Sequence, residues 1–191
     1  MLNRTWMLLV VCAPLALGGN PADEVTVVLD FDQPYSHLSL GEMEREAGAA
    51  LKNTGLTFAW KTQDSLDPNS EFKSLLVFKM KGRCAVNSSP MLLDERGPLG
   101  MAFVSDGQVL SFGEIECDRV NRSVQRSLPR GQSEKTERLY GRALGRVVAH
   151  EMYHMLSGKT KHSKSGLTQA ALTADELTAN HMDLIDIFSR K

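Results

Sequence analysis

Residues 136–156, TERLYGRALGRVVAHEMYHML, have the apolar spacing of an amphipathic helix. Apolar side chains recur three and four positions apart, which places them on one face of a helix. These positions are Leu139, Ala143, Leu144, Val147, Val148, Met152 and Met155. Gly158 is the expected C-cap, because glycine readily adopts the left-handed conformation in which many helices end. The stretch therefore predicts one long helix.

The chain before this helix has the pattern of a sheet. Residues 25–31, VTVVLDF, are β-branched and apolar, which is typical of a buried strand. Asp106-Gly107 lies between two apolar runs and predicts a hairpin, whose first arm is the expected edge strand. By the same criteria, strands are expected at 25–31, 57–61, 74–80, 101–104 and 108–112, and a helix at 39–52.

The remaining segments complete a predicted α+β fold. Residues 119–138 are polar and are interpreted as a solvated linker with a short helix before Pro129. Thr173–Phe188 is the expected last helix, and Thr173 with Glu176 forms a capping-box pattern at its start. The order is a strand, a helix, four strands and two helices around a loop, so we expect helices packed on one sheet.

The N-terminus has the features of an export signal. Arg4 precedes an uncharged run from Thr5 to Leu17, and small residues flank Leu17. Such a run is too short to span a bilayer and is typical of a secretory signal peptide. We expect cleavage after Gly18, a single domain over 19–191, and a secreted or periplasmic protein without stable membrane insertion.

Composition and cysteine content agree with an exported globular domain. Hydrophobic residues make up 42% of the chain and the formal net charge is −1, so no basic excess is available to bind nucleic acid. We expect a monomer. Removal of the signal leaves Cys84 and Cys117, and the simplest interpretation of two cysteines in an exported chain is one disulfide, with two buried free thiols as the alternative.

Three of the five histidines lie within residues 150–162. His150-Glu151-Met152-Tyr153-His154 matches the pattern H-E-x-x-H on the long helix. Residues four apart share one face of a helix, so His150 and His154 can bind one zinc ion. Glu151 is turned about 100° from His150 and is the candidate general base for a zinc-bound water.

Two residues are candidates for a third zinc ligand. His162 follows the Gly158 cap, where the chain can turn back toward the metal. Glu176 lies twenty-two residues after His154, close to the spacing of the third ligand in thermolysin-like zincins, although its capping-box role already accounts for it. We favour His162. His37 and His181 are interpreted as ordinary surface or core residues.

These residues resemble the metzincin zinc endopeptidases, whose motif is H-E-x-x-H-x-x-G-x-x-H followed by a methionine turn. In this chain Gly158 comes eight and His162 twelve residues after His150, so the segment is two residues longer than in the family. Ser165-Gly166-Leu167-Thr168 occupies the place of the turn, with Thr168 where methionine is expected. The resemblance implies an apolar residue beneath the metal, for which Leu167 and Met182 are candidates.

The sequence therefore predicts an exported zinc metalloprotease that acts on peptide or protein substrates. The resemblance implies a twisted mixed sheet with a helix before it, followed by the H-E-x-x-H helix and a C-terminal helix. A substrate is expected to pair with the edge strand near Met101–Val104. The alternatives are another exported zinc hydrolase, such as a cell-wall peptide amidase, and a zinc-binding interaction domain without catalysis.

Overall fold

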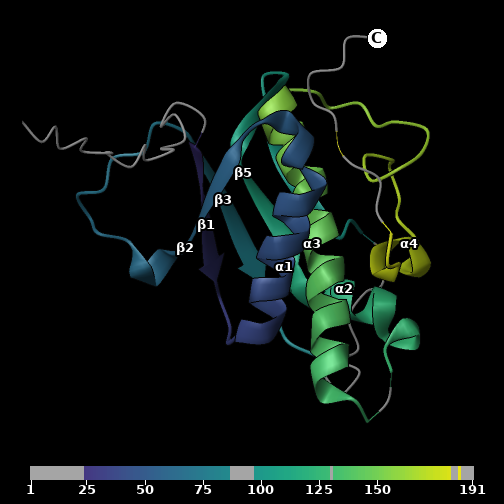
Figure 1. Ribbon diagram of the computed structural model, residues 1–191. Helices are drawn as coiled ribbons and strands as arrows, with labels where there is room; N and C mark the ends of the chain where they lie inside the picture. The colour runs from purple at the N-terminus through teal and green to yellow at the C-terminus, as the bar shows by residue number, and fades with distance from the viewer. Residues whose placement is uncertain (1–23, 87–96, 130, 182–184, 186–191) are drawn as a thin grey trace, which may run out of the picture.

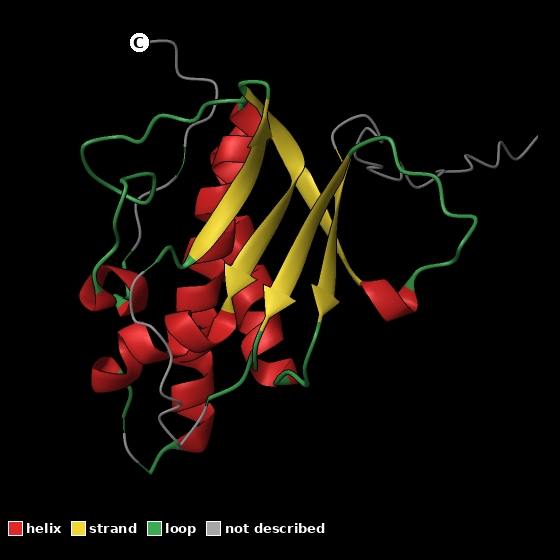
Figure 2. Cartoon of the chain, turned by 180° about the vertical axis from the view of Figure 1, so that it is seen from behind, coloured by secondary structure: helices red, strands yellow, loops and turns green. Residues whose placement is uncertain are grey.

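A five-stranded mixed sheet lies at the centre of the computed structural model, which describes residues 24–86, 97–129, 131–181 and 185. The strand order is β2-β1-β3-β5-β4. The strands lie side by side in one layer (Figure 2). Four strands are parallel, and β4 runs antiparallel to β5. The strands are β1 (Glu24–Phe31), β2 (Thr57–Thr62), β3 (Leu75–Lys81), β4 (Gly100–Ser105) and β5 (Gln108–Glu116).

Strand β4 is an edge strand of the sheet, as the sequence predicts, and β2 lies at the opposite edge. The turn between β4 and β5 contains Asp106 and Gly107 with φ of 50° and 77°, the positive values that a tight hairpin turn requires. A register shift between Ala102 and Val104 interrupts the pairing of β4 with β5. Because β4 is the last strand in the sheet order, the backbone groups on its outer edge have no partner strand within the sheet.

Helices cover one face of this sheet (Figure 1). The long helix α3 packs side by side with α1, and Gly141 and Gly145 of α3 permit the close approach. A Cβ atom at Gly141 would lie 2.4 Å from the carbonyl oxygen of Ser39, and one at Gly145 would lie 2.6 Å from that of Met43. The helices are α1 (His37–Ala50), α2 (Cys117–Val124), α3 (Ser133–Ser157) and α4 (Ala174–Thr178).

The fold is α+β, and the expected strands and the first two long helices are confirmed to within a few residues at each end. The expected signal peptide over 1–18 and the candidate Met182 lie outside the described residues. Among the helices of the described residues, none combines the length and the apolar composition that a membrane span requires.

The predicted last helix is much shorter than expected. The Thr173–Glu176 capping box is present, but α4 ends at Thr178 and residues 179–181 are not helical. Arg142 of α3 donates to the carbonyl oxygens of Thr178 and Ala179, both at 3.1 Å. Arg146 donates to those of Glu176 and Ala179. These guanidinium groups bind carbonyls at the end of α4, so the helix ends there.

The expected solvated linker over 119–138 is also wrong in its first half. Residues 117–124 form α2, and Cys117, Val120 and Val124 are fully buried in the core. The charged residues of this segment project from a helix whose opposite face packs against the domain. A short helix before Pro129 is correct, but it belongs to the core and not to a linker.

A disulfide joins Cys84 and Cys117, as predicted. Cys84 follows β3 and Cys117 follows β5, and these neighbouring parallel strands end at the same edge of the sheet. The two Cα atoms lie 4.9 Å apart, within the range that disulfides need.

Replacing both Cys84 and Cys117 by serine is expected to lower the free energy of unfolding. The disulfide closes a loop with a sequence separation of 33 residues, and the loss of that constraint on the unfolded chain costs about 3–4 kcal/mol. Urea unfolding of the oxidised protein and the double variant, followed by circular dichroism, measures the difference. Equal midpoints would contradict a stabilising role.

Arg146 forms the best-buried ion pair of the described chain. Its side chain is 2% exposed, and it donates to Glu46 of α1 at 2.9 Å. The same guanidinium binds the end of α4, so it connects α1, α3 and α4. Arg45 also contacts Glu46, at 3.0 Å, from a half-exposed position.

Arg146→Met is expected to destabilise the fold by about 3 kcal/mol or more, because it leaves the Glu46 carboxylate buried with a weaker partner. Arg138→Met is the matched control on the same helix. Arg138 pairs with Glu134 at the surface, and exposed pairs contribute at most about 1 kcal/mol. Similar urea midpoints for the two variants would contradict this role of Arg146.

Candidate metal centre

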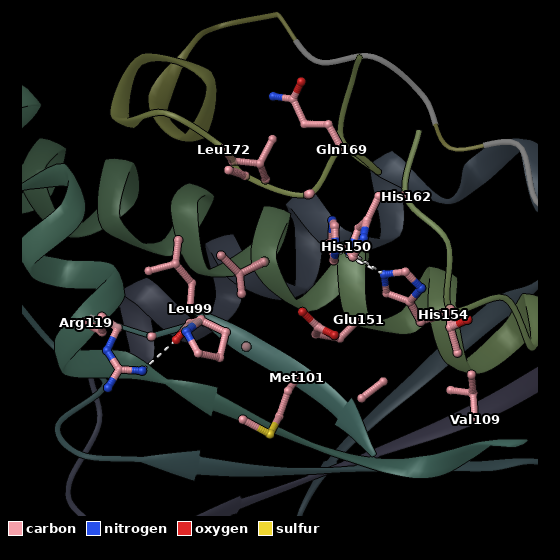
Figure 3. A pocket seen from close by; sticks show the side chains of 18 of the residues that line it. Leu99, Met101, Val109, Arg119, His150, Glu151, His154, His162, Gln169 and Leu172 are labelled. Carbon is pink, nitrogen blue, oxygen red and sulfur yellow. Dashed lines mark hydrogen bonds between the residues drawn. The ribbon is translucent and has the colours of Figure 1, made fainter. Parts of the chain in front are cut away.

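Three histidine side chains converge at the C-terminal end of α3. His150 and His154 lie one turn apart on the helix, and both are buried. The helix ends at Gly158 with φ of 64°, and the following loop returns His162 to the same place. The candidate ligand atoms of all three lie within 4.8 Å of one another (Figure 3).

Backbone carbonyls orient two of the imidazole rings. The Nδ1 of His150 lies 2.8 Å from the carbonyl oxygen of Leu167, and the Nδ1 of His154 lies 2.6 Å from that of Lys159. A carbonyl oxygen only accepts hydrogen bonds, so each Nδ1 carries the proton. In the neutral ring the Nε2 atom then has a free lone pair, which is the form that binds a metal ion.

The Nε2 atoms are spaced as ligands of one ion. The Nε2 of His154 lies 3.1 Å from that of His150 and 3.2 Å from that of His162. Two nitrogens that each lie 2.0–2.1 Å from a tetrahedral ion are about 3.3 Å apart. With both Nδ1 atoms protonated, no proton lies between the Nε2 atoms of His150 and His154, and a cation bound by both would relieve the repulsion of their lone pairs. The three residues therefore fit a metal ion.

Burial favours the neutral state of these rings. Desolvation lowers the pKa of His150 to about 4, against the raising effect of the Leu167 carbonyl. Burial also lowers the pKa of His154. Both histidines are neutral at pH 7, so a metal ion does not have to displace a proton from either of them.

Glu151 is buried beside the histidine cluster and points toward β4 (Figure 3). Desolvation raises the pKa of its carboxyl to about 7, while a hydrogen bond from the backbone amide of Ala102 lowers it. The Cγ of Glu151 also lies 3.1 Å from the position of a Cβ at Gly100. The carboxyl is thus held between the metal-site helix and the edge strand, and it is not among the three ligand positions.

A cleft of about 470 Å³ runs past these groups. One wall is the edge strand with the residues before it, and the other is α3 with the loop after His162 (Figure 3). Most of the lining side chains are apolar. The lining residues are Gly97, Pro98, Leu99, Gly100, Met101, Ala102, Val104, Val109, Arg119, Ser123, Val147, His150, Glu151, His154, Thr160, His162, Gln169, Ala170, Ala171 and Leu172.

Of the two candidates for a third ligand, His162 and Glu176, only His162 lies beside His150 and His154. Glu176 caps α4, where its Oε2 accepts from the amide of Thr173 at 2.8 Å and its Oε1 accepts from Gln169 at 2.7 Å. Hydrogen bonds from Thr173 lower the pKa of Glu176. His162 lies in the cluster instead, so His150, His154 and His162 are positioned to bind a metal ion.

The segment in place of a methionine turn contacts the centre through its backbone. Leu167 is buried, and its carbonyl oxygen is the partner of His150. The sequence indicated Leu167 only as an apolar residue, because a main-chain hydrogen bond across seventeen positions leaves no mark in the side-chain pattern. Sequence reasoning also missed Arg119 and Ser123 of the cleft, since it assigned their segment to a linker.

In comparisons with known proteins, no family model and no curated sequence matches this chain. The function must therefore be argued from the chemistry of the site.

Proposed function

We propose that this protein is an exported zinc metallopeptidase that cleaves within peptide chains and is metzincin-like in its site. One observation carries the proposal: three imidazole Nε2 atoms converge beside a buried carboxyl in a cleft along an edge strand. Neutral imidazole ligands suit zinc, and three protein ligands leave one position for water or substrate, as in catalytic zinc sites.

His150, His154 and His162 are the proposed zinc ligands, and Glu151 is the proposed general base. When held by these three histidines, zinc would lower the pKa of a bound water and would polarise the carbonyl of the scissile bond. Glu151 takes a proton from the attacking water and returns it to the leaving amine. Burial raises the pKa of the Glu151 carboxyl, and the positive charge of a bound zinc ion would lower it again, so Glu151 would be a carboxylate that can accept the proton of the water.

The edge strand is the proposed docking site for the substrate backbone. β4 lines the cleft opposite α3, and an extended peptide can add to it as a further strand. The Ala102 amide holds the Glu151 carboxyl on this same edge. A peptide paired with β4 therefore passes directly across the proposed base. Met101 and Val104, which are partly exposed, supply apolar contacts.

Export is proposed from the signal-like N-terminus, and the Cys84–Cys117 disulfide supports it, since disulfides persist in oxidising compartments. The proposed mature enzyme is a monomer from which the signal peptide has been removed.

A quenched fluorescent peptide library tests the proposed activity. The mature protein is expected to contain about one zinc per chain and to cleave internal bonds. 1,10-Phenanthroline is expected to abolish cleavage, and added zinc is expected to restore it. Zinc content is measured on the same preparation by mass spectrometry.

The remaining outcomes distinguish the other functions. Cleavage of isolated cell-wall peptides but not of the library would assign an amidase and overturn the endopeptidase proposal. Stoichiometric zinc without hydrolysis of either substrate would leave a metal-binding domain. Cleavage that is insensitive to the chelator would contradict a metal mechanism.

A further inference from the structure

The cleft extends beyond the histidines to a guanidinium group on α2. Arg119 lines its far end and is the sole lysine or arginine among the described lining residues (Figure 3). The wall between it and the metal centre is mainly apolar, with Leu99, Val147 and Leu172. The cleft thus combines a metal site, an apolar middle part and one fixed cation.

Local packing holds Arg119 in this place. Its Nη1 donates to the carbonyl oxygen of Pro98 at 2.7 Å. A Cβ at Gly97 would lie only 2.8 Å from this Nη1 atom. A guanidinium has five N–H donors, so further donors remain beside the one that binds Pro98. Among the ion pairs of the described residues, none joins Arg119 to a carboxylate.

The separation of Pro98 from Ala102 along the chain shows how far Arg119 lies from the proposed scissile bond. Glu151 contacts the edge strand at Gly100 and Ala102, and Pro98 precedes them by two and four residues. Because an extended chain spans at most about 3.6 Å per residue, Pro98 lies no more than about 14 Å from Ala102. A peptide paired with β4 therefore brings a residue two to four positions from the scissile bond beside Arg119.

We propose that Arg119 binds a carboxylate of the substrate, two to four residues from the bond at Glu151, and so selects peptides that carry a carboxylate at this position. This inference rests on the proposed peptidase function. A guanidinium binds a carboxylate through two parallel, charge-assisted hydrogen bonds, which are about twice as strong as hydrogen bonds between neutral groups. The carboxylate comes from an aspartate or glutamate side chain or from the C-terminus of the peptide.

Strand direction separates these two sources. A peptide antiparallel to β4 runs toward Pro98, so its C-terminal part reaches Arg119 and a free C-terminus can bind there. A parallel peptide presents its N-terminal part, where only an acidic side chain supplies the carboxylate. The two sources are therefore tested in separate peptides.

Equilibrium binding tests the inference independently of hydrolysis. The probes are dansyl-labelled heptapeptides of alanine and leucine: a neutral C-terminal amide, the same peptide with a free C-terminus, amides with glutamate at each internal position, and matched lysine peptides. The zinc-loaded mature protein carries Glu151→Gln to prevent turnover. At least one carboxylate peptide is expected to bind about tenfold tighter than the neutral amide, as charge-assisted hydrogen bonds allow.

Arg119→Gln is expected to remove this advantage, and Arg126→Gln is expected to retain it. Arg126 is an exposed arginine after α2 that does not line the cleft, so it controls for the loss of one positive charge. An equal affinity for all peptides would overturn the inference. An advantage that persists in Arg119→Gln would place the carboxylate elsewhere, for example on the metal, and would also overturn it.

A structural role of Arg119 gives a different result. If Arg119 only clamps the Pro98 segment, Arg119→Gln weakens neutral and acidic peptides alike, which contradicts carboxylate recognition. Thermal unfolding and zinc content check that this variant is folded and loaded. Hydrolysis without acidic preference would retain the proposed function and reject the inference. Arg119-dependent binding of carboxylate peptides without hydrolysis would retain the inference and reject the proposed function.

Discussion

Glu151→Gln is expected to reduce peptide hydrolysis by about 10²–10⁴-fold, the contribution of a positioned general base. Glutamine has nearly the same shape as glutamate and still accepts a hydrogen bond from the Ala102 amide. The contact between α3 and β4 should therefore be preserved. Its amide cannot take a proton from water. The kcat/KM for a quenched peptide measures the loss.

Zinc content should be unchanged in the same variant, because the Glu151 carboxyl is not one of the three converging ligand atoms. Glu134→Gln is the control for an acidic side chain on the same helix, at an exposed position. Loss of zinc from Glu151→Gln would identify Glu151 as a ligand. Full activity with zinc retained would show that another group is the base.

The local features of the fold could be predicted because short-range chemistry determines them. The C-cap at Gly158 and the hairpin turn at Asp106-Gly107 depend on residues that accept positive φ. The capping box at Thr173 and Glu176 depends on two side chains three positions apart. Each of these signals lies within a few residues of the structure that it specifies.

Features that depend on distant partners could not be predicted in the same way. The end of α4 is determined by Arg142 and Arg146, more than thirty positions earlier in the chain. Gly141 and Gly145 would be read from the sequence as weak points of a helix, yet they allow α1 to pack against α3. Tertiary contacts outweigh local propensity at the two glycines and at the end of α4.

The metal centre depends both on a local sequence pattern and on contacts between residues that are distant in the chain. The helical period places His150 beside His154, so this pair followed directly from the sequence. The position of His162 depends on a loop that closes on itself, where the Ser163 amide donates to the carbonyl oxygen of Thr168 at 3.0 Å. The same loop supplies the Leu167 carbonyl that orients His150. One segment therefore positions His162 and fixes the tautomer of His150.

His162→Ala is expected to lower zinc affinity by at least about 100-fold, because loss of a direct ligand costs more than loss of a residue that only orients one. The α3 pair remains, so weak binding by His150 and His154 should persist. Competition with a chromogenic zinc chelator at pH 7.5 measures the dissociation constant of each variant.

Glu176→Ala and His181→Ala are the controls for the measurement of zinc affinity. Glu176 accepts from Thr173 and Gln169, so its loss should weaken the capping box of α4 and leave zinc affinity unchanged. His181 is an exposed histidine outside the cluster, and its loss should change neither quantity. A collapse of zinc affinity in Glu176→Ala, with normal affinity in His162→Ala, would require the thermolysin-like ligand set. The loop after Gly158 would then have to leave the metal, and α4 would have to move toward it.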